Sequence, residues 1–318
     1  MTKRILLVKT SSLGDLIHNL PLVNDIRSAS PGATIDWVVE ETFLFIARLH
    51  PGLTAAIPVA IRRWRRTPWR RGTRDEIAAF LRRLRAQSYD AVIDSQGLMK
   101  SALIAFAARG IRCGLDWKSA REPLGMFYDR TFRVPWTQHA VERNRLLAAL
   151  ALGYALPDRL DYGITAVARA FDWLGAGEYA VLLHATSGDY KLWDENNWIT
   201  LGKSLNALGI KCVLPWGNVV ERRRAERIAN ALSAAAVPPA LSLDDLAALF
   251  AGARAVTGVD TGLTHLAAAL GKPTVGIFVA TNPAATGIYG CPRAANLGGI
   301  RHPPSAAEVI AELHRLAP

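Results

Sequence analysis

Cysteine is scarce in this sequence, with three residues in a chain of 318, at Cys113, Cys212 and Cys291. They lie far apart, are odd in number and show no CxxC spacing. A disulfide framework or a zinc-finger type of site would need paired, closely spaced cysteines. We therefore expect a protein of a reducing compartment that is held together by its apolar core.

Long apolar runs are also missing. The N-terminal segment MTKRILLVKT has only four apolar residues in a row before Lys9, which is too short for the apolar region of a secretory signal. No stretch approaches the roughly 20 apolar residues that a membrane-spanning helix needs. We expect a cytoplasmic protein.

Familiar cofactor fingerprints are absent as well. No GxGxxG follows a predicted strand, and no GxxxxGK[ST] occurs, which disfavours NAD-dependent redox chemistry and P-loop hydrolysis. Histidine, cysteine and carboxylate side chains do not cluster at metal-ligand spacing. We expect neither a cofactor nor a metal site.

What the sequence does have is a surplus of positive charge. The formal net charge is +11, and residues 1–150 hold 24 Lys and Arg against 13 Asp and Glu, whereas the remainder holds 14 of each. The whole surplus therefore lies in the N-terminal half, which is expected to face an anionic partner.

Apolar strand-like segments alternate with helical patterns along the chain. Strands are expected at 5–9, 35–39, 91–94, 180–184, 210–216, 255–259 and 273–278, and helices at 15–28, 98–109, 195–208, 219–235, 243–252 and 262–270. This alternation predicts an α/β protein with two doubly wound, Rossmann-like domains facing each other across a cleft. We place them at residues 1–160 and 161–318, with residues 152–177 as the crossing, and leave open that the last helix crosses back to the N-terminal domain.

Polar motifs follow the predicted strands, where ligands of open parallel sheets bind. In GVDTGLTHL a strand ends at a helix start, a ready site for a diphosphate, although an ordinary capped helix explains it too. HATSGDYKLW adds hydroxyls and an ammonium, which suit phosphate oxygens, although in isolation a surface loop with a solvated lysine explains it as well or better. Glu221 follows PWG as a possible ribose acceptor or a simple first-turn carboxylate. The candidate residues are Thr186, Ser187, Lys191, Glu221, Asp260, Thr261, Gly262 and His265.

An arginine cluster, IRRWRRTPWRRGTR, occupies residues 61–74 and includes Trp64 and Trp69. Guanidinium groups bind phosphates and carboxylates in bidentate fashion, and interleaved tryptophan also suits nucleic acid or a membrane interface. Seven arginines in so short a stretch favour an anionic partner over a merely solvated loop. Further cations follow at Lys100 and Arg121.

Several stretches together resemble the heptosyltransferase family of lipopolysaccharide inner-core synthesis. They include VKTSSLGDLIHNLP, IPVAIRRWRR, YDAVIDSQGLMKSALIA, GLDWKSAREPL, EYAVLLHATSGDYKLW and VDTGLTHLAAAL, and they run from residue 1 to about 270. The match is to the enzymes that add the first heptose. Beyond about residue 280 the resemblance weakens, because Asn282-Pro283 replaces the family's usual prolyl-aspartyl turn.

The resemblance implies a GT-B fold and an inverting transfer of L-glycero-D-manno-heptose from ADP-heptose to the Kdo of Kdo-lipid A. The C-terminal domain would bind the donor through the eight residues named above, and the N-terminal domain would bind the acceptor. Contact with the cytoplasmic face of the inner membrane is expected, and nucleic acid is not. No cofactor or metal is implied, and domain closure would exclude water.

Asp15 is the general base by this resemblance, although on local grounds alone a first-turn carboxylate favoured by the helix dipole is the better explanation. Lys191 would act with the helix start at Thr261 and Gly262 to stabilise the departing ADP. The expected acceptor residues are Ser12, Gly14, Arg62, Arg63, Arg66, Lys100 and Arg121.

Three alternatives stay open at this stage. A later heptosyltransferase would use the same donor on an already heptosylated core. A nucleic-acid-binding protein would use the Arg/Trp stretch, as would a membrane-binding module without catalysis, but neither accounts for the ordered polar motifs of the C-terminal half.

Overall fold

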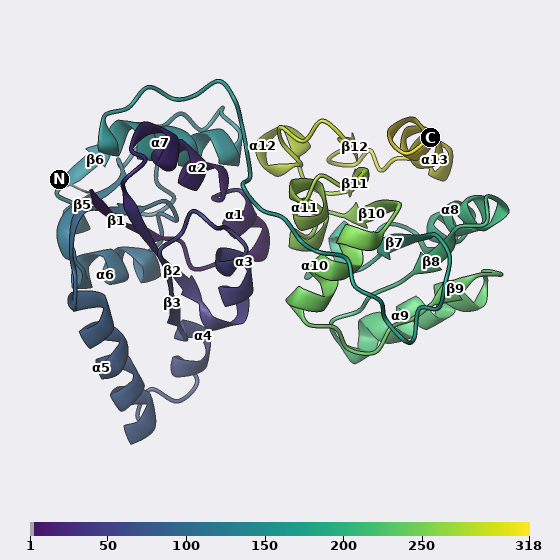
Figure 1. Cartoon of the computed structure of the whole chain (residues 1–318), viewed down its shortest axis with the longest axis horizontal. Coiled ribbons are helices and arrows are strands. Elements are labelled where there is room, and N and C mark those ends of the chain that lie inside the picture. Colours follow the sequence, from purple (N-terminus) through teal and green to yellow (C-terminus); the bar gives the residue numbers. More distant parts are fainter. Residues whose placement is uncertain (1–2) are drawn as a thin grey trace. The chain divides into compact units, whose positions relative to one another are not determined.

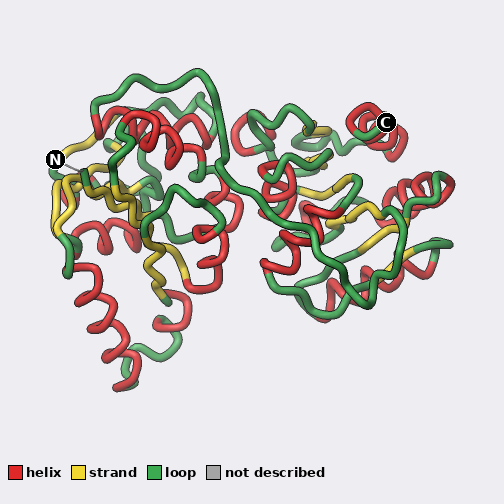
Figure 2. The backbone as a smooth tube through the Cα atoms, viewed as in Figure 1, coloured by secondary structure: helices red, strands yellow, loops and turns green. Residues whose placement is uncertain are grey.

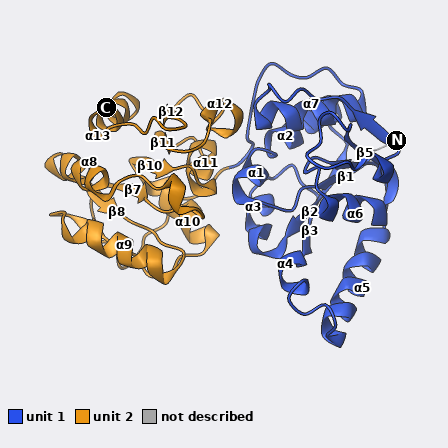
Figure 3. Cartoon of the chain, turned by 180° about the vertical axis from the view of Figure 1, so that it is seen from behind, with its two compact units in different colours: residues 1–164 blue, residues 165–318 orange. Residues whose placement is uncertain are grey.

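The computed structural model describes residues 3–318. The chain divides into two compact units, Met1–Ile164 (unit 1) and Thr165–Pro318 (unit 2) (Figure 3). The division lies close to the expected boundary at residue 160. Each unit is built on a six-stranded parallel sheet with helices on its faces. The predicted α/β class with two Rossmann-like domains is confirmed.

Unit 1 has the strand order β3-β2-β1-β4-β5-β6. Helices α2 and α7 pack together on one face of the sheet, and α5 and α6 lie on the other (Figure 1). The strands are β1 (Arg4–Val8), β2 (Thr34–Glu40), β3 (Ala55–Val59), β4 (Ser88–Asp94), β5 (Arg109–Leu115) and β6 (Arg130–Phe132). The helices are α1 (Leu13–Ile17), α2 (Pro21–Ala29), η1 (Glu41–Phe43), α3 (Leu44–Arg48), α4 (Ile61–Trp64), α5 (Arg71–Arg85), α6 (Met99–Ala107), η2 (Gly125–Phe127) and α7 (Ala140–Leu152).

Unit 2 repeats the topology, with the strand order β12-β11-β10-β7-β8-β9. Its strands are β7 (Tyr179–Leu183), β8 (Lys211–Val213), β9 (Ala235–Ala236), β10 (Ala255–Val259), β11 (Thr274–Phe278) and β12 (Ala294–Gly298). Its helices are η3 (Asp189–Lys191), α8 (Glu195–Ala207), α9 (Val219–Asn230), α10 (Leu243–Gly252), α11 (Gly262–Ala269), α12 (Pro283–Thr286) and α13 (Ala306–Leu316).

The central strands are buried on both faces, which explains why they read as unbroken apolar runs. Ile5, Leu6, Leu7 and Val8 of β1 are fully buried, and every residue of β7, β10 and β11 is buried. In both units the direction of strand order reverses beside the first strand, between β1 and β4 and between β7 and β10. Loops that leave the carboxyl ends of such strands form the ligand-binding edge of doubly wound sheets.

Several expectations about elements need correction. The helix expected at 219–235 ends at Asn230, and Ala235 already belongs to β9. The single helix expected at 15–28 is two helices, because the chain turns after α1 and α2 starts afresh with Pro21 at its first position. The helix expected at 98–109 ends at Ala107, and Arg109 begins β5. The last helix, α13, does not cross back, since it buries Val309, Leu313 and Leu316 in the core of unit 2.

The crossing between the units, residues 153–178, has neither helix nor strand, in line with the expectation for 152–177 (Figure 2). Its first part is fastened to unit 1 by a buried ion pair. Arg145 of α7 donates to both carboxylate oxygens of Asp25 on α2, at 2.7 and 3.1 Å, and also to the carbonyls of Pro157 and Arg159.

Asp25→Ala is expected to destabilise unit 1 by about 3–5 kcal/mol, because it leaves a buried guanidinium without its carboxylate. Glu142→Ala serves as the control: Glu142 also pairs with Arg145 but is more exposed, and its loss should cost about 1 kcal/mol or less. Urea unfolding of the full chain, followed by tryptophan fluorescence, measures both. Equal effects of the two substitutions would contradict the structural role of the Asp25 pair.

None of the helices within residues 3–318 combines the length and the apolar character that a bilayer crossing requires.

Candidate functional site

The loops after β1 and β4 are bound to each other at the ligand-binding edge of unit 1. Gln96 accepts hydrogen bonds from the backbone N–H and the hydroxyl of Thr10, at 2.7 and 2.8 Å. The buried Lys9 donates to the Ser95 carbonyl at 2.8 Å and to Oδ1 of Asn144 on α7 at 3.2 Å. These bonds fix the segment that carries the predicted base.

Asp94, at the end of β4, shapes the second of these loops. Its Oδ1 accepts from the backbone N–H groups of Gln96 and Gly97, and its Oδ2 accepts from the Tyr128 hydroxyl at 2.8 Å. Burial raises the pKa of this carboxyl, whereas these hydrogen bonds act in the opposite direction. The carboxylate is fully committed to the loop, so it serves structure and not chemistry.

Asp15 lies in the first turn of α1, as predicted. Its Oδ2 accepts from the backbone N–H and the hydroxyl of Ser12, at 2.8 and 2.9 Å, while its Oδ1 receives no hydrogen bond from the residues that the structure describes. The Ser11–Ser12 peptide is cis. One carboxylate oxygen is thus held in place, and the other is available to a ligand.

Asp15 is part of the lining of a pocket of about 610 Å³ within unit 1. The predicted residue Arg121 shares this lining with Asp15, whereas Lys9, Trp136 and Arg143 were not predicted. Arg143 stacks on the Trp136 ring at 3.6 Å. Burial and the neighbouring Arg121 lower the pKa of Arg143 to about 10. The pocket therefore places one carboxylate among several cations.

Lys100, on α6, reaches the loop after β1. Its Nζ donates to the Ser11 hydroxyl at 2.5 Å. Burial lowers the pKa of Lys100, and the positive charge of Arg62 lowers it further, whereas Glu40 and Asp15 raise it. The predicted Lys100, Arg62 and Asp15 thus belong to one electrostatic neighbourhood.

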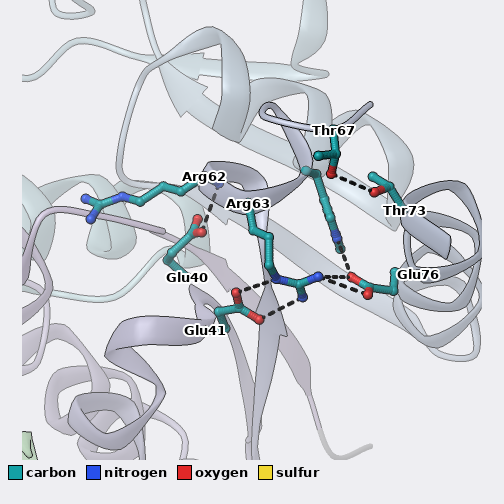
Figure 4. A network of polar contacts seen from close by, with 8 residues as sticks. Glu40, Glu41, Arg62, Arg63, Thr67, Thr73 and Glu76 are labelled. Carbon is teal, nitrogen blue, oxygen red and sulfur yellow. Dashed lines mark hydrogen bonds and ion pairs between the residues drawn. The ribbon is translucent and has the colours of Figure 1, made fainter. Parts of the chain in front are cut away.

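The arginine cluster divides into bound and available side chains. Arg63 lies between two glutamates and pairs with Glu41 at 3.0 Å and with Glu76 at 2.7 Å, whereas the Arg62 guanidinium points away from them (Figure 4). Among residues 3–318, Arg62 makes one hydrogen bond, from its backbone N–H to Glu40 at 3.0 Å, and its guanidinium lies 5.1 Å from the Phe43 ring. Within the described chain, the Arg66 side chain has no ion pair or hydrogen bond.

In unit 2, Asp260 is the centre of the corresponding cluster after β7 and β10. Its Oδ2 accepts from Lys191 Nζ and from the Thr281 hydroxyl, each at 2.8 Å, and its Oδ1 lies 3.7 Å from His265 Nε2. Burial alone would raise the pKa of Asp260, but the bonds from His265, Lys191 and Thr281 outweigh it and hold that pKa well below its usual range.

Thr186 joins this cluster to a neighbouring pocket. Its hydroxyl donates to the Asp260 carbonyl at 2.9 Å, and Thr186, Ser187 and Glu221 all line a pocket of about 1630 Å³ that is open to solvent. Thr261 is the N-cap residue of α11 and Gly262 its first residue, although the Thr261 side chain makes no capping bond. The N-terminal turn of α11 begins beside the Lys191–Asp260 pair.

Glu221 has a structural role in α9. Its two carboxylate oxygens accept from the backbone N–H of Gly217 at 2.7 Å and from the Asn218 side chain at 2.8 Å. The alternative of a first-turn carboxylate therefore describes its present contacts, while its place in the pocket lining keeps it next to any ligand there. No group of three or more His, Cys, Asp or Glu suited to a metal occurs in residues 3–318.

Sequence reasoning missed several residues of these sites. Lys9 could have been found from its position directly after the apolar run of β1, where ligand-binding residues of parallel sheets lie. Thr281 lies in the divergent loop after β11. Asn144, Arg143 and Trp136 reach the pocket only through the packing of α7 and its preceding loop in unit 1, and no local pattern marks them.

Comparison with known proteins supplies the family. Residues 77–311 match glycosyltransferase family 9 (heptosyltransferase). Over 290 residues the chain is 50% identical to lipopolysaccharide heptosyltransferase 1 of Pseudomonas aeruginosa, covering 90% of this chain and 81% of that protein. It is 46% identical to the protein of the same name from Escherichia coli K12, covering 90% and 91%.

A solved structure agrees with the sequence relatives. The E. coli heptosyltransferase WaaC with ADP superimposes with a TM-score of 0.90 at 42% identity, covering 99% of this chain and 100% of that one. The same enzyme with ADP-2-deoxy-2-fluoro heptose gives 0.84, with 98% of each chain covered. The chain therefore belongs to glycosyltransferase family 9, the heptosyltransferase family, and is a glycosyltransferase of the GT-B type.

Proposed function

We propose that this enzyme transfers L-glycero-D-manno-heptose from ADP-heptose to the Kdo of Kdo-lipid A, the first heptose addition of the lipopolysaccharide inner core. The main support is sequence identity of 46–50% over nine-tenths of the chain to proteins named lipopolysaccharide heptosyltransferase 1. A later heptosyltransferase is the alternative, and the nucleic-acid interpretation of the Arg/Trp stretch loses support. Trp64 is engaged internally, donating to Glu76 at 2.7 Å and packing on Phe80.

Unit 2 is proposed to bind ADP-heptose. The α11 N-terminus, the Lys191 ammonium and the hydroxyls of Thr186 and Ser187 offer the groups that bind a diphosphate. Asp260 holds Lys191 in place through the 2.8 Å ion pair, with His265 on its other oxygen. Glu221, which lines the neighbouring pocket, is proposed as the acceptor for ribose hydroxyls.

Unit 1 is proposed to bind the acceptor. Arg121, Lys100, Arg62 and Arg66 provide cations for its phosphates and carboxylates, and Ser12 and Gly14 lie where its sugar meets the backbone turn. Arg63 stays in the proposal with a changed role, because Glu41 and Glu76 already neutralise its charge. It fixes α4, the short helix that carries Arg62.

The reaction is proposed as a single displacement with inversion at the anomeric carbon. Asp15 accepts the proton of the attacking Kdo hydroxyl as the new bond forms, and the bond to ADP breaks on the opposite face. Ser12 holds one oxygen of Asp15, so the other is oriented for this proton transfer. Lys191 and the helix N-terminus stabilise the charge that develops on the diphosphate.

A direct assay tests the function. The enzyme is incubated with ADP-heptose and either Kdo-lipid A or an already heptosylated core, and product is measured by mass spectrometry. We expect kcat/KM to favour Kdo-lipid A strongly. A preference for the heptosylated core would assign the chain to a later step.

Arg62→Ala is expected to raise the acceptor KM by about ten-fold or more, since it removes an available guanidinium. Arg63→Lys, which breaks the bridge between Glu41 and Glu76, is the matched comparison and should alter the acceptor KM less. Steady-state kinetics at fixed donor concentration measure both. A larger KM change for Arg63→Lys would reverse the assigned roles.

The proposed reaction needs no metal, because Lys191 and the α11 N-terminus supply the positive charge at the diphosphate. Activity is therefore expected to persist at about its full rate in excess EDTA. The measurement is initial rate with and without chelator, followed by addition of Mg²⁺. Loss of activity that Mg²⁺ restores would refute the metal-free mechanism.

The enzyme is also proposed to work in the cytoplasm, peripherally at the inner face of the inner membrane, where a lipid-linked acceptor would lie. No cofactor other than the donor substrate is invoked.

A further inference from the structure

Helix α6 presents an apolar side to solvent. Met99, Leu103 and Phe106 recur at helical spacing and are 44%, 51% and 55% exposed, and Met126 of the nearby η2 is 84% exposed. Phe106 packs edge-on against Phe127 of η2, which joins the two segments. We call Met99, Leu103, Phe106 and Met126 the α6 face. The opposite side of α6 is buried in the core of unit 1.

An apolar groove extends the α6 face toward α4 and α5. Figure 1 shows α6 lying beside α5 on the side of the sheet away from α7. The groove has a volume of about 1440 Å³, and its apolar walls include Ile61, Ile77, Leu81 and Leu103. Contiguous exposed apolar surface of this kind marks an interaction site.

The surroundings of the α6 face are basic. Arg65 lines the groove, Arg85 donates to the Ala107 carbonyl at the end of α6, and Arg112 lies 5.0 Å from the Phe106 ring. Two carboxylates are also near: Asp129 pairs with Arg112, and Glu122 accepts from the Met99 backbone N–H. Asp129 neutralises Arg112, whereas Glu122 keeps its negative charge. Arg65 and Lys100 of the groove and Arg85 beside it outnumber Glu122, so the net charge offered to a partner is positive.

A partner of the α6 face must therefore be apolar and anionic at once. A bilayer with anionic headgroups satisfies both conditions, because acyl chains receive the apolar side chains and headgroups meet the arginines. A second copy of this chain fits less well, since a two-fold contact would bring like-charged arginines together.

The α6 face is continuous with the candidate acceptor site. Leu98 lines both the groove and the pocket of Asp15, and Lys100 links α6 to Ser11. From Met99 to Phe106 the helix rises about 10 Å. A bilayer seated at the Phe106 end would leave the polar part of a lipid-linked sugar to extend toward Asp15.

We propose that the α6 face and its groove dock unit 1 on the surface of an anionic bilayer. Docking on the bilayer does not require heptose transfer. Its benefit for catalysis rests on the proposed function, in which the acceptor carries lipid. The α6 face is then the surface by which the enzyme binds the membrane that contains its lipid-linked acceptor.

The test uses the full-length protein and two carboxylate substitutions, Leu103→Glu and Met126→Glu. Leu150→Glu is the matched control, because Leu150 is 43% exposed on α7, away from this face. Binding is measured by flotation with vesicles of equal parts phosphatidylcholine and phosphatidylglycerol, and with phosphatidylcholine alone. We expect each test variant to lower partitioning to the anionic vesicles by about ten-fold or more, the control to behave as wild type, and added salt to weaken wild-type binding.

Transfer assays separate docking from chemistry. With Kdo-lipid A in vesicles, kcat/KM of the test variants should fall in proportion to binding, whereas with a deacylated, water-soluble Kdo acceptor it should stay within about two-fold of wild type. Unchanged vesicle binding in both variants would overturn the proposal, and so would an equal loss of vesicle binding in Leu150→Glu. A wild-type dimer that dissociates in the two variants would also overturn it, because the α6 face would then bind a second copy of the chain. An equal loss with both acceptors would also overturn it and assign the groove to the acceptor itself. Wild-type protein that binds vesicles but transfers heptose to neither acceptor would instead refute the proposed function.

Discussion

Asp15→Asn is expected to lower kcat for heptose transfer by about 10²–10⁴-fold, because the amide cannot take the proton of the attacking hydroxyl. Asparagine keeps the shape of the side chain and an oxygen that can accept from Ser12, so α1 should keep its N-terminal turn. Affinity for ADP, measured by isothermal titration calorimetry, should be nearly unchanged, since the proposed ADP site belongs to unit 2. The expected signature is thus a loss of turnover without a loss of nucleotide binding.

Ser12→Ala separates orientation of the base from the base itself. It removes the hydroxyl that holds Oδ2 but leaves the backbone N–H bond and the carboxylate, so kcat should fall far less than in Asp15→Asn. Capping losses of this kind cost about 1 kcal/mol in stability, and thermal unfolding would register it. Turnover of Asp15→Asn above about a tenth of wild type would remove Asp15 from the role of base, since general bases contribute far more than that.

The central strands of both sheets were predictable because strands buried on both faces consist of runs of apolar residues. β1, β7, β10 and β11 are buried on both faces and read as apolar runs. β3, β6 and β12 lie at sheet edges and are short or partly exposed, so their patterns are weak. The exposed start of β5, Arg109 to Ile111, likewise resembled the end of a helix.

The candidate sites were predictable to the extent that they follow strands. Topology alone places the loops after β1, β4, β7 and β10 at ligand-binding edges, and Asp15, Lys191 and Asp260 lie there or directly after. The assignment of Asp15 as the base came from the family resemblance, because on local grounds alone the helix dipole is the better explanation of a first-turn aspartate. Arg143 and Asn144 escaped prediction, since they reach the pocket only when α7 packs onto the sheet.

The arginine cluster shows why composition alone misjudges a site. All its arginines carry the same formal charge in the sequence, yet Glu41 and Glu76 neutralise Arg63 while Arg62 stays available. Glu41 is distant from the cluster along the chain and meets Arg63 only because β2 and β3 are neighbours in the sheet. The cluster's binding capacity therefore depends on tertiary pairing.

Lys191→Met is expected to lower kcat/KM for ADP-heptose by about 10²-fold or more, because it removes a cation aimed at charge that grows on the leaving diphosphate. Methionine keeps most of the length of the side chain and its packing. The Lys191 ammonium is now bound to Asp260 at 2.8 Å, and both side chains are largely buried, so the donor meets a cation that is already positioned. The acceptor KM should stay within about two-fold of wild type, because unit 1 is unchanged.

The Asp260 carboxylate provides the control for this experiment. Its pKa is held well below the usual range, so its contribution to stability is complete above the unfolded pKa of about 4 and is lost only as the pH falls toward the lower folded value. An assay near neutral pH therefore tests Lys191 in an intact cluster, in which Thr281 and His265 still contact Asp260. Asp260→Asn should weaken donor use less than Lys191→Met, because it loosens the lysine without removing it. If Lys191→Met changed only the acceptor KM, the roles of the two units would be the reverse of those proposed. Lys191, in the segment after β7, would then bind the acceptor and not the donor.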